Sequence, residues 1–315
     1  MRSFLIRRVA AIVPLLIIIT FAVYALVLLI PGDPARTLAG GIKASPAAIE
    51  QIRHQLHLDQ PLLAQYWRWL THAVRGDLGT SLFQHQSVAS GIVQRLPLTL
   101  SLALGGFVVS ILLGLPLGIL AGTRPGSVTD RAATVGSSLG IAMPDFWVAI
   151  ILVVVFAVKA RILPDIGYVG LGTDPWQWFR HLLLPWIALG LAGAATLARQ
   201  VRGALIDALD QDYVRTARAM GVPERQVVGK LALKNALTPA MTVLGIQFAY
   251  LLGGTVIIEQ IFSIPGLGAY ILQAIDSKDL PVIQGTVLLI AVIFVVVNLL
   301  VDLAYGVVNP KVRVS

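Results

Sequence analysis

Six stretches of the chain are almost uniformly apolar, and their length restricts the fold more than any other feature. An α-helix needs about 20 apolar residues to cross a hydrocarbon core roughly 30 Å thick. Lipid offers no hydrogen bonds to the backbone, so only helices or closed barrels cross it, and these runs lack the alternation of barrel strands. The sequence therefore predicts an all-α integral membrane protein with six transmembrane helices, at residues 9–30, 98–121, 134–158, 182–198, 235–258 and 282–301.

The composition agrees with lipid as the solvent. Hydrophobic residues make up 57% of the chain and charged residues only 13%. A net charge of +8 is also typical of nucleic-acid binding, but the basic residues are spread over the connections between spans, where they set the orientation. The chain has no cysteine, which excludes disulfides, thiolate chemistry and cysteine-ligated metals.

The basic residues at the two ends predict that both termini are cytosolic. Three arginines lie within residues 1–8, ahead of the first span, and six crossings return residues 302–315 to the same side. A cleaved signal peptide is the alternative interpretation. The first apolar run is about 22 residues long, however, and no small-residue cleavage site follows it. We therefore expect a retained first span.

Residues 31–97 form the largest segment predicted outside the cell. A segment longer than about 60 residues is translocated largely regardless of its charge, so its basic residues do not contradict this assignment. Within it, residues 45–58 predict a helix with Ser45 as N-cap and Pro46 at the first helical position. We expect a small helical extracellular insertion; a solvated loop that merely connects two spans is the alternative.

The cytosolic loop at 199–234 contains two short predicted helices. Asp210 or Asp212 can cap the first, and basic residues follow later in it, as the helix dipole favours. Gly221 suits the left-handed residue just past its end, and Pro223 begins the second helix.

An apolar stripe runs along the first of these two helices. Val214, Ala217 and Met220 recur at spacings of three, on a helix too short to be stable alone. The stripe therefore has to pack on something. It packs either on the chain's own membrane domain or in a groove of a separate cytosolic subunit, and the periodicity favours neither.

The segment Tyr213-Val-Arg-Thr-Ala-Arg-Ala-Met-Gly221, followed by Asn235-Ala-Leu-Thr-Pro239, resembles the EAA motif of ABC importer permeases. The resemblance extends over nearly the whole chain and is greatest to the dipeptide, oligopeptide and nickel permeases, the inner-membrane components of binding-protein-dependent transport. Arg215 stands where that motif normally has its first glutamate, so a role of that acid does not carry over. Other segments contribute in order: Pro31-Gly-Asp-Pro34, Leu58-Asp-Gln-Pro61, Gly76-Asp-Leu-Gly-Thr-Ser81, Pro144-Asp-Phe-Trp147, Gly253-Gly254, Glu259-Gln-Ile-Phe-Ser263, Pro265-Gly-Leu-Gly268, and Asn298 with Asp302 and Tyr305.

The resemblance implies a type I ABC importer permease in the bacterial plasma (inner) membrane. Its partners would be a second permease subunit, usually a different homologous chain, two cytosolic ATPase subunits and an extracytoplasmic solute-binding protein. The short helix would be the coupling helix, which sits in the ATPase cleft and moves the spans when the ATPases close. The resemblance assigns this coupling to Asp212, Tyr213, Arg215, Thr216, Ala217, Arg218, Ala219, Gly221 and Pro239. The solute would be a di- or oligopeptide, with nickel, glutathione or another small solute as alternatives.

Polar residues within the spans are candidates for the pathway or for a subunit interface. Asp145 lies in the third predicted span, where a charge costs about 2.5–3.5 kcal/mol on insertion scales. It either lines the pathway or pairs with a partner subunit, or it satisfies backbone amides freed by Pro144. Asn298 and Asp302, near the end of the last span, are further candidates.

Glycine and alanine recur at four-residue spacing on the second and fourth predicted spans. The residues are Gly105, Gly106, Gly114, Gly118 and Gly122, and Gly190, Ala194 and Ala198. Small faces let helices approach closely, within the subunit or against a second permease. A smooth wall for solute passage is the secondary interpretation.

The sequence predicts no catalytic, cofactor or metal site. It lacks the phosphate-binding pattern G-x-x-x-x-G-K-[ST], so energy from ATP has to come from a partner. His54 and His57 have helical spacing, but two ligands are too few for a metal site. A secondary transporter driven by an ion gradient is the rival class, and it would need coupling charges in the spans, where only Asp145, Asp302 and Glu259 come near. A membrane enzyme would need a cluster of acid–base residues that is absent here.

Overall fold

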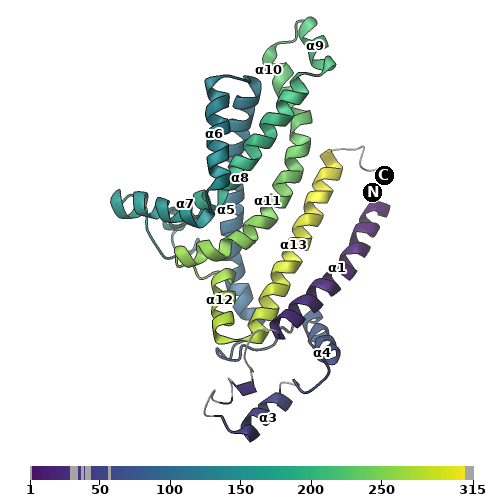
Figure 1. Ribbon diagram of the computed structural model, residues 1–315, viewed down its shortest axis with the longest axis vertical. Helices are drawn as coiled ribbons and strands as arrows, with labels where there is room; N and C mark the ends of the chain where they lie inside the picture. The colour runs from purple at the N-terminus through teal and green to yellow at the C-terminus, as the bar shows by residue number, and fades with distance from the viewer. Residues whose placement is uncertain (1, 29–34, 37–38, 40–43, 56–57, 309–315) are drawn as a thin grey trace. The chain divides into compact units, whose positions relative to one another are not determined.

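The computed structural model describes residues 2–28, 35–36, 39, 44–55 and 58–308, and the regular elements among them are helices joined by loops (Figure 1). No strand occurs among these residues, which confirms the predicted all-α class. The helices are α1 (Arg2–Leu28), α3 (Pro46–Gln55), α4 (Leu62–Val74), α5 (Val88–Thr123), α6 (Val128–Ala142), α7 (Asp145–Leu152), α8 (Pro175–Leu209), α9 (Asp212–Ala219), α10 (Glu224–Gln226), α11 (Leu233–Ile261), α12 (Leu267–Ser277) and α13 (Leu280–Val308). The π-helical segment η2 (Val153–Lys159) continues α7, and a second π-helical segment, η3 (Val227–Ala232), leads into α11.

Four helices of the described part are long and apolar enough to cross a membrane. They are Val88–Thr123, Pro175–Leu209, Glu224–Ile261 and Leu280–Leu300, and they contain the second, fourth, fifth and nearly all of the sixth predicted span. α1 contains most of the first predicted span, of which residues 29–30 lie outside the described residues. The crossings themselves, and the sides that the loops face, stay predictions.

The third predicted span, 134–158, differs from the structure because it is not one continuous helix. Its two parts, α6 and α7 with η2, are bent by 103° at the break between them. Pro144 lacks a backbone N–H and forces the preceding residue out of helical geometry, and Met143 is accordingly extended, with ψ 123°. Asp145 is therefore the first residue of α7 and not a charge in the middle of a straight helix.

The predicted helix at 45–58 is present as α3, and Ser45 Oγ accepts a hydrogen bond from Ala48 N at 3.2 Å. α5 begins at Val88, ten residues before the predicted span, and so includes the last ten residues of the segment predicted to lie outside the cell. Gln94, Arg95 and Pro97 interrupt the apolar run without interrupting the helix. The motif at 31–34 and the segment after residue 308 lie outside the described residues.

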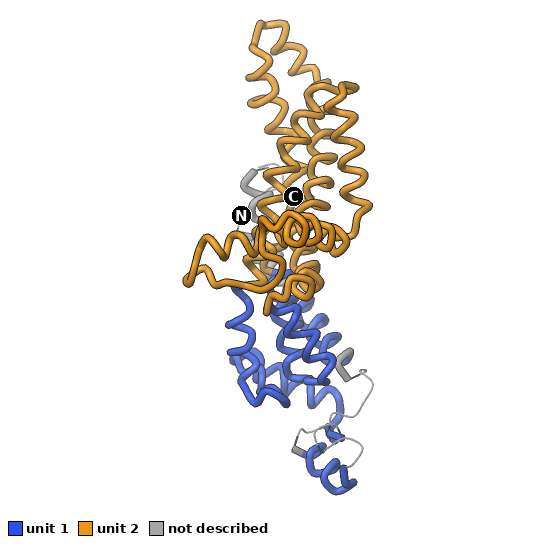
Figure 2. The backbone as a smooth tube through the Cα atoms, turned by 90° about the vertical axis from the view of Figure 1, so that its left-hand side faces the viewer, with its two compact units in different colours: residues 1–97, 266–295 blue, residues 98–265, 296–315 orange. Residues whose placement is uncertain are grey.

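The chain divides into two compact units, coloured separately in Figure 2. Unit 1 consists of residues 1–97 and 266–295, and unit 2 of residues 98–265 and 296–315.

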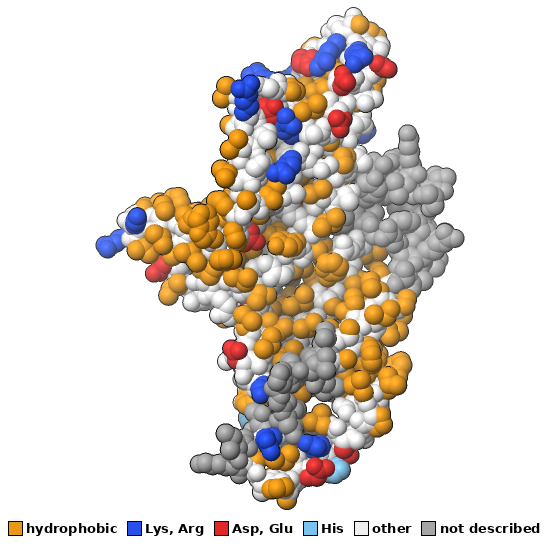
Figure 3. Space-filling model, viewed as in Figure 1, with side chains coloured by type: hydrophobic (Ala, Val, Ile, Leu, Met, Phe, Trp, Pro, Cys, Tyr) orange, Lys and Arg blue, Asp and Glu red, His pale blue; other side chains and the backbone are white. Residues whose placement is uncertain are grey.

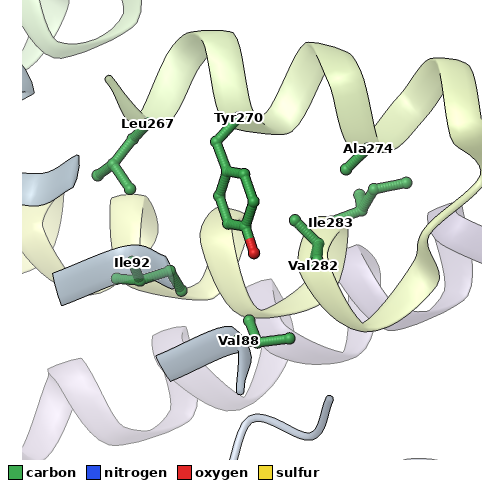
Figure 4. Packing of buried hydrophobic residues seen from close by; sticks show 7 residues of the cluster. All are labelled: Val88, Ile92, Leu267, Tyr270, Ala274, Val282 and Ile283. Carbon is green, nitrogen blue, oxygen red and sulfur yellow. The ribbon is translucent and has the colours of Figure 1, made fainter. Parts of the chain in front are cut away.

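Unit 1 has a hydrophobic core formed by α12 and the first turns of α5 and α13 (Figure 4). Tyr270 is 4% exposed and lies among apolar side chains from these helices, while the guanidinium of Arg95 lies 4.2 Å from its ring centre. The members are Val88, Ile92, Leu267, Tyr270, Ala274, Val282 and Ile283.

Elsewhere in unit 1, aromatic side chains join α1 to α4. Tyr66 on α4 is buried edge-on against Phe21, with ring centres 5.2 Å apart, and its hydroxyl lies 2.9 Å from that of Thr20.

Asp279, just before α13, holds the loop at residues 81–82. Its buried carboxylate accepts hydrogen bonds from Ser81 Oγ at 2.5 Å and Leu82 N at 3.2 Å. These contacts order the loop that precedes α5.

Unit 2 is built around α8, which packs against α6, α7 and α11 and lies beside α5 (Figure 1). Much of the middle of α8 is buried, with Leu189, Leu197 and Val201 each at most 1% exposed. α8 is therefore the central helix of this unit.

Candidate functional site

The predicted coupling segment forms a short helix, α9, at one end of unit 2. Asp212 lies in its first turn and Arg218 in its last, as the helix dipole favours. The predicted cap is wrong: Gln211 occupies the N-cap position and makes no side-chain hydrogen bond, while Asp210 ends α8. Gly221 has the predicted left-handed conformation, with φ +78°, and directs the chain into α10.

The apolar stripe on α9 is divided between two environments. Val214 and Ala217 are 0% and 5% exposed, and they pack with Val227 of η3 in a small core of their own. Met220 is 73% exposed. Two of the three positions therefore pack on the chain's own domain, and the third is left on the surface beside Gly221.

The face of α9 opposite this core is polar and open. The side chains of Tyr213, Arg215, Thr216 and Arg218 are exposed, and Ala219 lies among them. Arg215 Nη2 lies 2.8 Å from Asp210 Oδ1, and Arg218 donates to both carboxylate oxygens of Glu224 at 2.6 and 3.1 Å. The Arg218 guanidinium lowers the pKa of Glu224. In Figure 3, charged side chains gather over this end of unit 2.

Tyr213 and Pro239 lie on the same shallow hollow, although 26 positions separate them in the sequence. The hydroxyl of Tyr213 accepts a hydrogen bond from Asn235 Nδ2 at 2.9 Å, which joins α9 to the first turn of α11. The hollow, about 390 Å³, is also lined by Asp207 and Gln211 of the preceding segment. The structure thus brings the two parts of the predicted motif together.

An ion pair that the sequence analysis missed joins α6 to α8 near this end. Arg202 Nε donates to Asp130 Oδ1, and Arg202 Nη2 donates to Asp130 Oδ2 at 2.9 Å. Gly126 N also donates to Asp130. The hydrogen bonds from Arg202 and, to a smaller extent, the one from Gly126 stabilise the ionised carboxylate and lower the pKa of Asp130 to about 2. Neither residue lies in a recognisable motif, so only their spatial proximity reveals the pair.

The small residues of α5 and α8 pack against each other, which confirms their predicted role in close helix contact. A Cβ atom on Gly118 would lie 2.7 Å from Ala198 O, and one on Gly190 would lie 2.6 Å from Gly106 O. The helices therefore meet backbone to backbone.

A polar contact between α5, α8 and α11 was also missed. The hydroxyl of Ser110 lies 2.9 Å from both Gly106 O and Gly190 O and shares its proton between these two carbonyl oxygens. Ser110 Oγ also accepts a hydrogen bond from Gln247 Nε2 at 2.9 Å. Ser110 is fully buried and Gln247 is 9% exposed. A second buried contact in unit 2 links Thr99 Oγ1 to Glu259 Oε1 at 2.7 Å, so this acid is held inside the protein.

Of the three candidate pathway residues, Asp145 lines a hollow. It is half-buried and borders two adjoining hollows of about 620 and 350 Å³ on unit 2. No hydrogen bond to a backbone amide involves its side chain among the described residues, so the proposed local role at Pro144 finds no support there. Asn298 is half-buried on α13 and lines neither hollow, and the side chain of Asp302 lies outside the described residues.

Comparison with known proteins extends these findings over the whole chain. Residues 1–103 match the family described as "Binding-prot-dependent transport system membrane comp, N-term", and residues 114–314 match "Binding-protein-dependent transport system inner membrane component". A peptide transport system permease protein of Brucella abortus (strain 2308) is 42% identical over 313 residues, 99% of each chain. The glutathione transport system permease protein GsiC of Escherichia coli (strain K12) is 39% identical over 313 residues, again 99% of each chain.

A solved structure supports the fold. The chain resembles the MetNI methionine ABC transporter in an inward-facing conformation, with a TM-score of 0.56 and 20% identity over 69% of this chain and 96% of that one. The helical fold and these matches define a transport permease of the ABC importer class. The chain belongs to the family of binding-protein-dependent transport system inner membrane components.

Proposed function

We propose that this chain is the permease subunit of an ATP-driven importer that moves di- or oligopeptides. The permease class follows from the family, and the choice of peptide is supported by relatives named as peptide transport permeases. Glutathione, itself a tripeptide, is the first alternative, since GsiC is almost as similar. Nickel or another small solute is the second alternative.

In this proposal the chain works with three kinds of partner. A second permease, a different homologous chain, completes the pathway; two cytosolic ATPases supply the energy; and an extracytoplasmic binding protein delivers the solute. Both termini and α9 face the cytosol of a bacterial cell, as the distribution of basic residues predicts. The chain itself binds no cofactor and carries out no covalent chemistry.

The observation that carries the proposal is the division of α9 into a buried and an open face. Val214 and Ala217 fix the helix to its own domain, and Met220 and the polar face remain for a partner. We assign contact with the ATPase to the exposed residues Asp212, Tyr213, Arg215, Thr216, Arg218 and Ala219, with Gly221 ending the helix, Ala217 supporting it and Pro239 beside it.

We assign the polar residues within the predicted spans to the translocation pathway and to the interface between the two permeases. Asp145 faces the solute across the two hollows that it lines. Asn298 and Asp302 on α13 belong to the interface with the second permease. A charged side chain at membrane depth is most often functional, because its burial is costly.

Co-purification of the ATPase tests the central assignment. We would compare wild type with Met220→Glu, which places a charge on the exposed position without disturbing the buried pair. Val128→Glu is the matched control, because Val128 is 84% exposed at the start of α6 and lies outside α9. We expect the ATPase with wild type and the control and not with Met220→Glu.

Two results contradict the proposal. If the Met220→Glu variant still co-purified with the ATPase, α9 would not be part of the contact with it. A wild-type chain that moves solute with no ATPase bound would instead favour a secondary transporter driven by an ion gradient.

A further inference from the structure

Two adjoining hollows on unit 2 share Asp145, Ala192 and Tyr250 among their lining residues. The larger, about 620 Å³, lies between the bend at Pro144 and α11, and the smaller, about 350 Å³, lies between α8 and α11. Both fall within the range of roughly 300–1,000 Å³ that is usual for small-ligand sites. Together they are large enough to hold part of a small organic solute.

Among the described residues that line either hollow, Asp145 is the one with a charged side chain. It has no hydrogen-bond or ion-pair partner in the part of the chain that the structure describes. Gly254 leaves space beside it, since a Cβ there would lie 3.7 Å from Asp145 Oδ2. A carboxylate held in an apolar hollow without a cation is costly, and an incoming cation would offset that cost.

One other polar side chain around the smaller hollow offers a hydrogen-bond acceptor. Thr196 donates its hydroxyl proton to Ala192 O at 3.0 Å, so its oxygen remains free to accept. A carboxylate and a hydroxyl oxygen on the same hollow suit a ligand that only donates, and an ammonium group has three donors and no acceptor.

The same chemistry separates an organic ammonium from a metal ion. A divalent transition metal needs three or more ligating side chains such as carboxylates or imidazoles. The described residues around the two hollows supply one carboxylate and no imidazole. The site therefore favours an ammonium group over nickel.

We propose that Asp145 receives the free ammonium group of the solute, so that the substrate class of this permease is peptides with an unmodified amino end. This inference rests on the proposed peptide function. Asp145 is only half-buried, so the contact stays hydrated and reversible, as passage through a pathway requires.

Uptake into liposomes that contain the complete importer tests the inference. The probe is trialanine with a free amino end, supplied on saturating binding protein, and binding-protein-stimulated ATP hydrolysis is measured in parallel. Asp145→Asn removes the charge at constant size, Asp145→Glu keeps the charge, and Asp165→Asn removes a carboxylate from an exposed loop. We expect trialanine uptake to fall about tenfold in Asp145→Asn. Uptake should be largely retained in Asp145→Glu and unchanged in Asp165→Asn, with ATP hydrolysis preserved in all three.

Unchanged uptake by Asp145→Asn would overturn the inference. So would equal loss in Asp145→Glu and Asp145→Asn, because size and not charge would then be limiting. Loss of ATP hydrolysis together with uptake in Asp145→Asn would assign the residue to assembly instead. Failure of the wild-type importer to take up any peptide with ATP would reject the proposed function itself, which distinguishes the two failures.

Discussion

Arg202 on α8 and Asp130 on α6 form a two-pronged ion pair in which Nε and Nη2 each meet one carboxylate oxygen. Asp130 is 4% exposed and also accepts from Gly126 N, so the carboxylate fixes the loop before α6 as well. A planar guanidinium matches a carboxylate in this way and an ammonium does not. The pair therefore sets the register of the two helices.

Replacement of Arg202 by lysine should lower the thermal stability of the purified chain. Lysine keeps the positive charge, but its ammonium group cannot form both of the parallel hydrogen bonds that the guanidinium donates to the carboxylate of Asp130. Arg199→Lys is the control, since within the described part of the chain Arg199 makes only an exposed contact of 3.4 Å with Ser138. Equal melting temperatures for the two variants would show that the pair does not hold α6 to α8.

The pH dependence of the same pair has a definite sign. The pKa of Asp130 is about 2 in the folded chain and about 3.9 in an unfolded one, so the ionised carboxylate favours folding above that range. The stabilisation is lost as the pH falls through about 2. The melting temperatures of wild type and Asp130→Asn should therefore differ by the same amount at pH 7 and pH 5 and converge toward pH 2. Convergence already at pH 5 would contradict the assignment.

The space around two glycines predicts opposite effects of their replacement by alanine. Gly118→Ala should destabilise the chain by about 1–3 kcal/mol, because the added carbon would meet Ala198 O and Val201. Gly136→Ala, on the exposed side of α6 with nothing within 4 Å, should stabilise it by about 0.5–1 kcal/mol. Thermal unfolding in detergent measures both. If Gly118→Ala did not lower the stability, α5 and α8 would have to be farther apart than the structure shows.

The end of α9 depends on backbone conformation and not on space. Gly221 has φ +78°, and a Cβ atom added to it would meet no atom within 4 Å, so Gly221→Ala costs about 1–2 kcal/mol through conformation alone. Asparagine adopts this conformation more readily. Bound ATPase should therefore decrease for Gly221→Ala and be closer to wild type for Gly221→Asn. Equal loss in both would indicate a steric requirement of the partner.

The two sides of α9 should respond differently to truncation. Val214→Ala removes buried methyl groups and should cost about 1–3 kcal/mol of stability. Met220→Ala, at an exposed position, should leave the melting temperature unchanged and reduce ATPase binding. A large stability loss in Met220→Ala would show that this side chain packs within the chain.

Apolar run length predicts the helical class and most of the long helices, because lipid leaves the backbone few choices. It cannot place the 103° bend, since Pro144 and Asp145 interrupt a run that is otherwise apolar enough for one span. A proline by itself indicates only a kink. The angle of the bend depends on the helices against which α7 packs, and the residues near Pro144 do not reveal which helices these are.

The α9 region was predictable in part. Helix spacing and the glycine stop follow from local rules, so the helix and Gly221 were predicted correctly. Periodicity cannot tell which neighbour covers an apolar stripe, and the division between Val214 and Met220 needed the fold. The wrong cap has a similar origin: Asp210 completes α8, a tertiary extension that the polar sequence around it concealed.

The attachment of α9 has a mechanical consequence. η3, against which Val214 and Ala217 pack, continues without a break into α11, so that residues 224–261 form one continuous helical segment of 38 residues, which curves along its length (Figure 1). In the proposed coupling, a displacement of α9 therefore acts on a helix whose far half borders the hollows at Asp145.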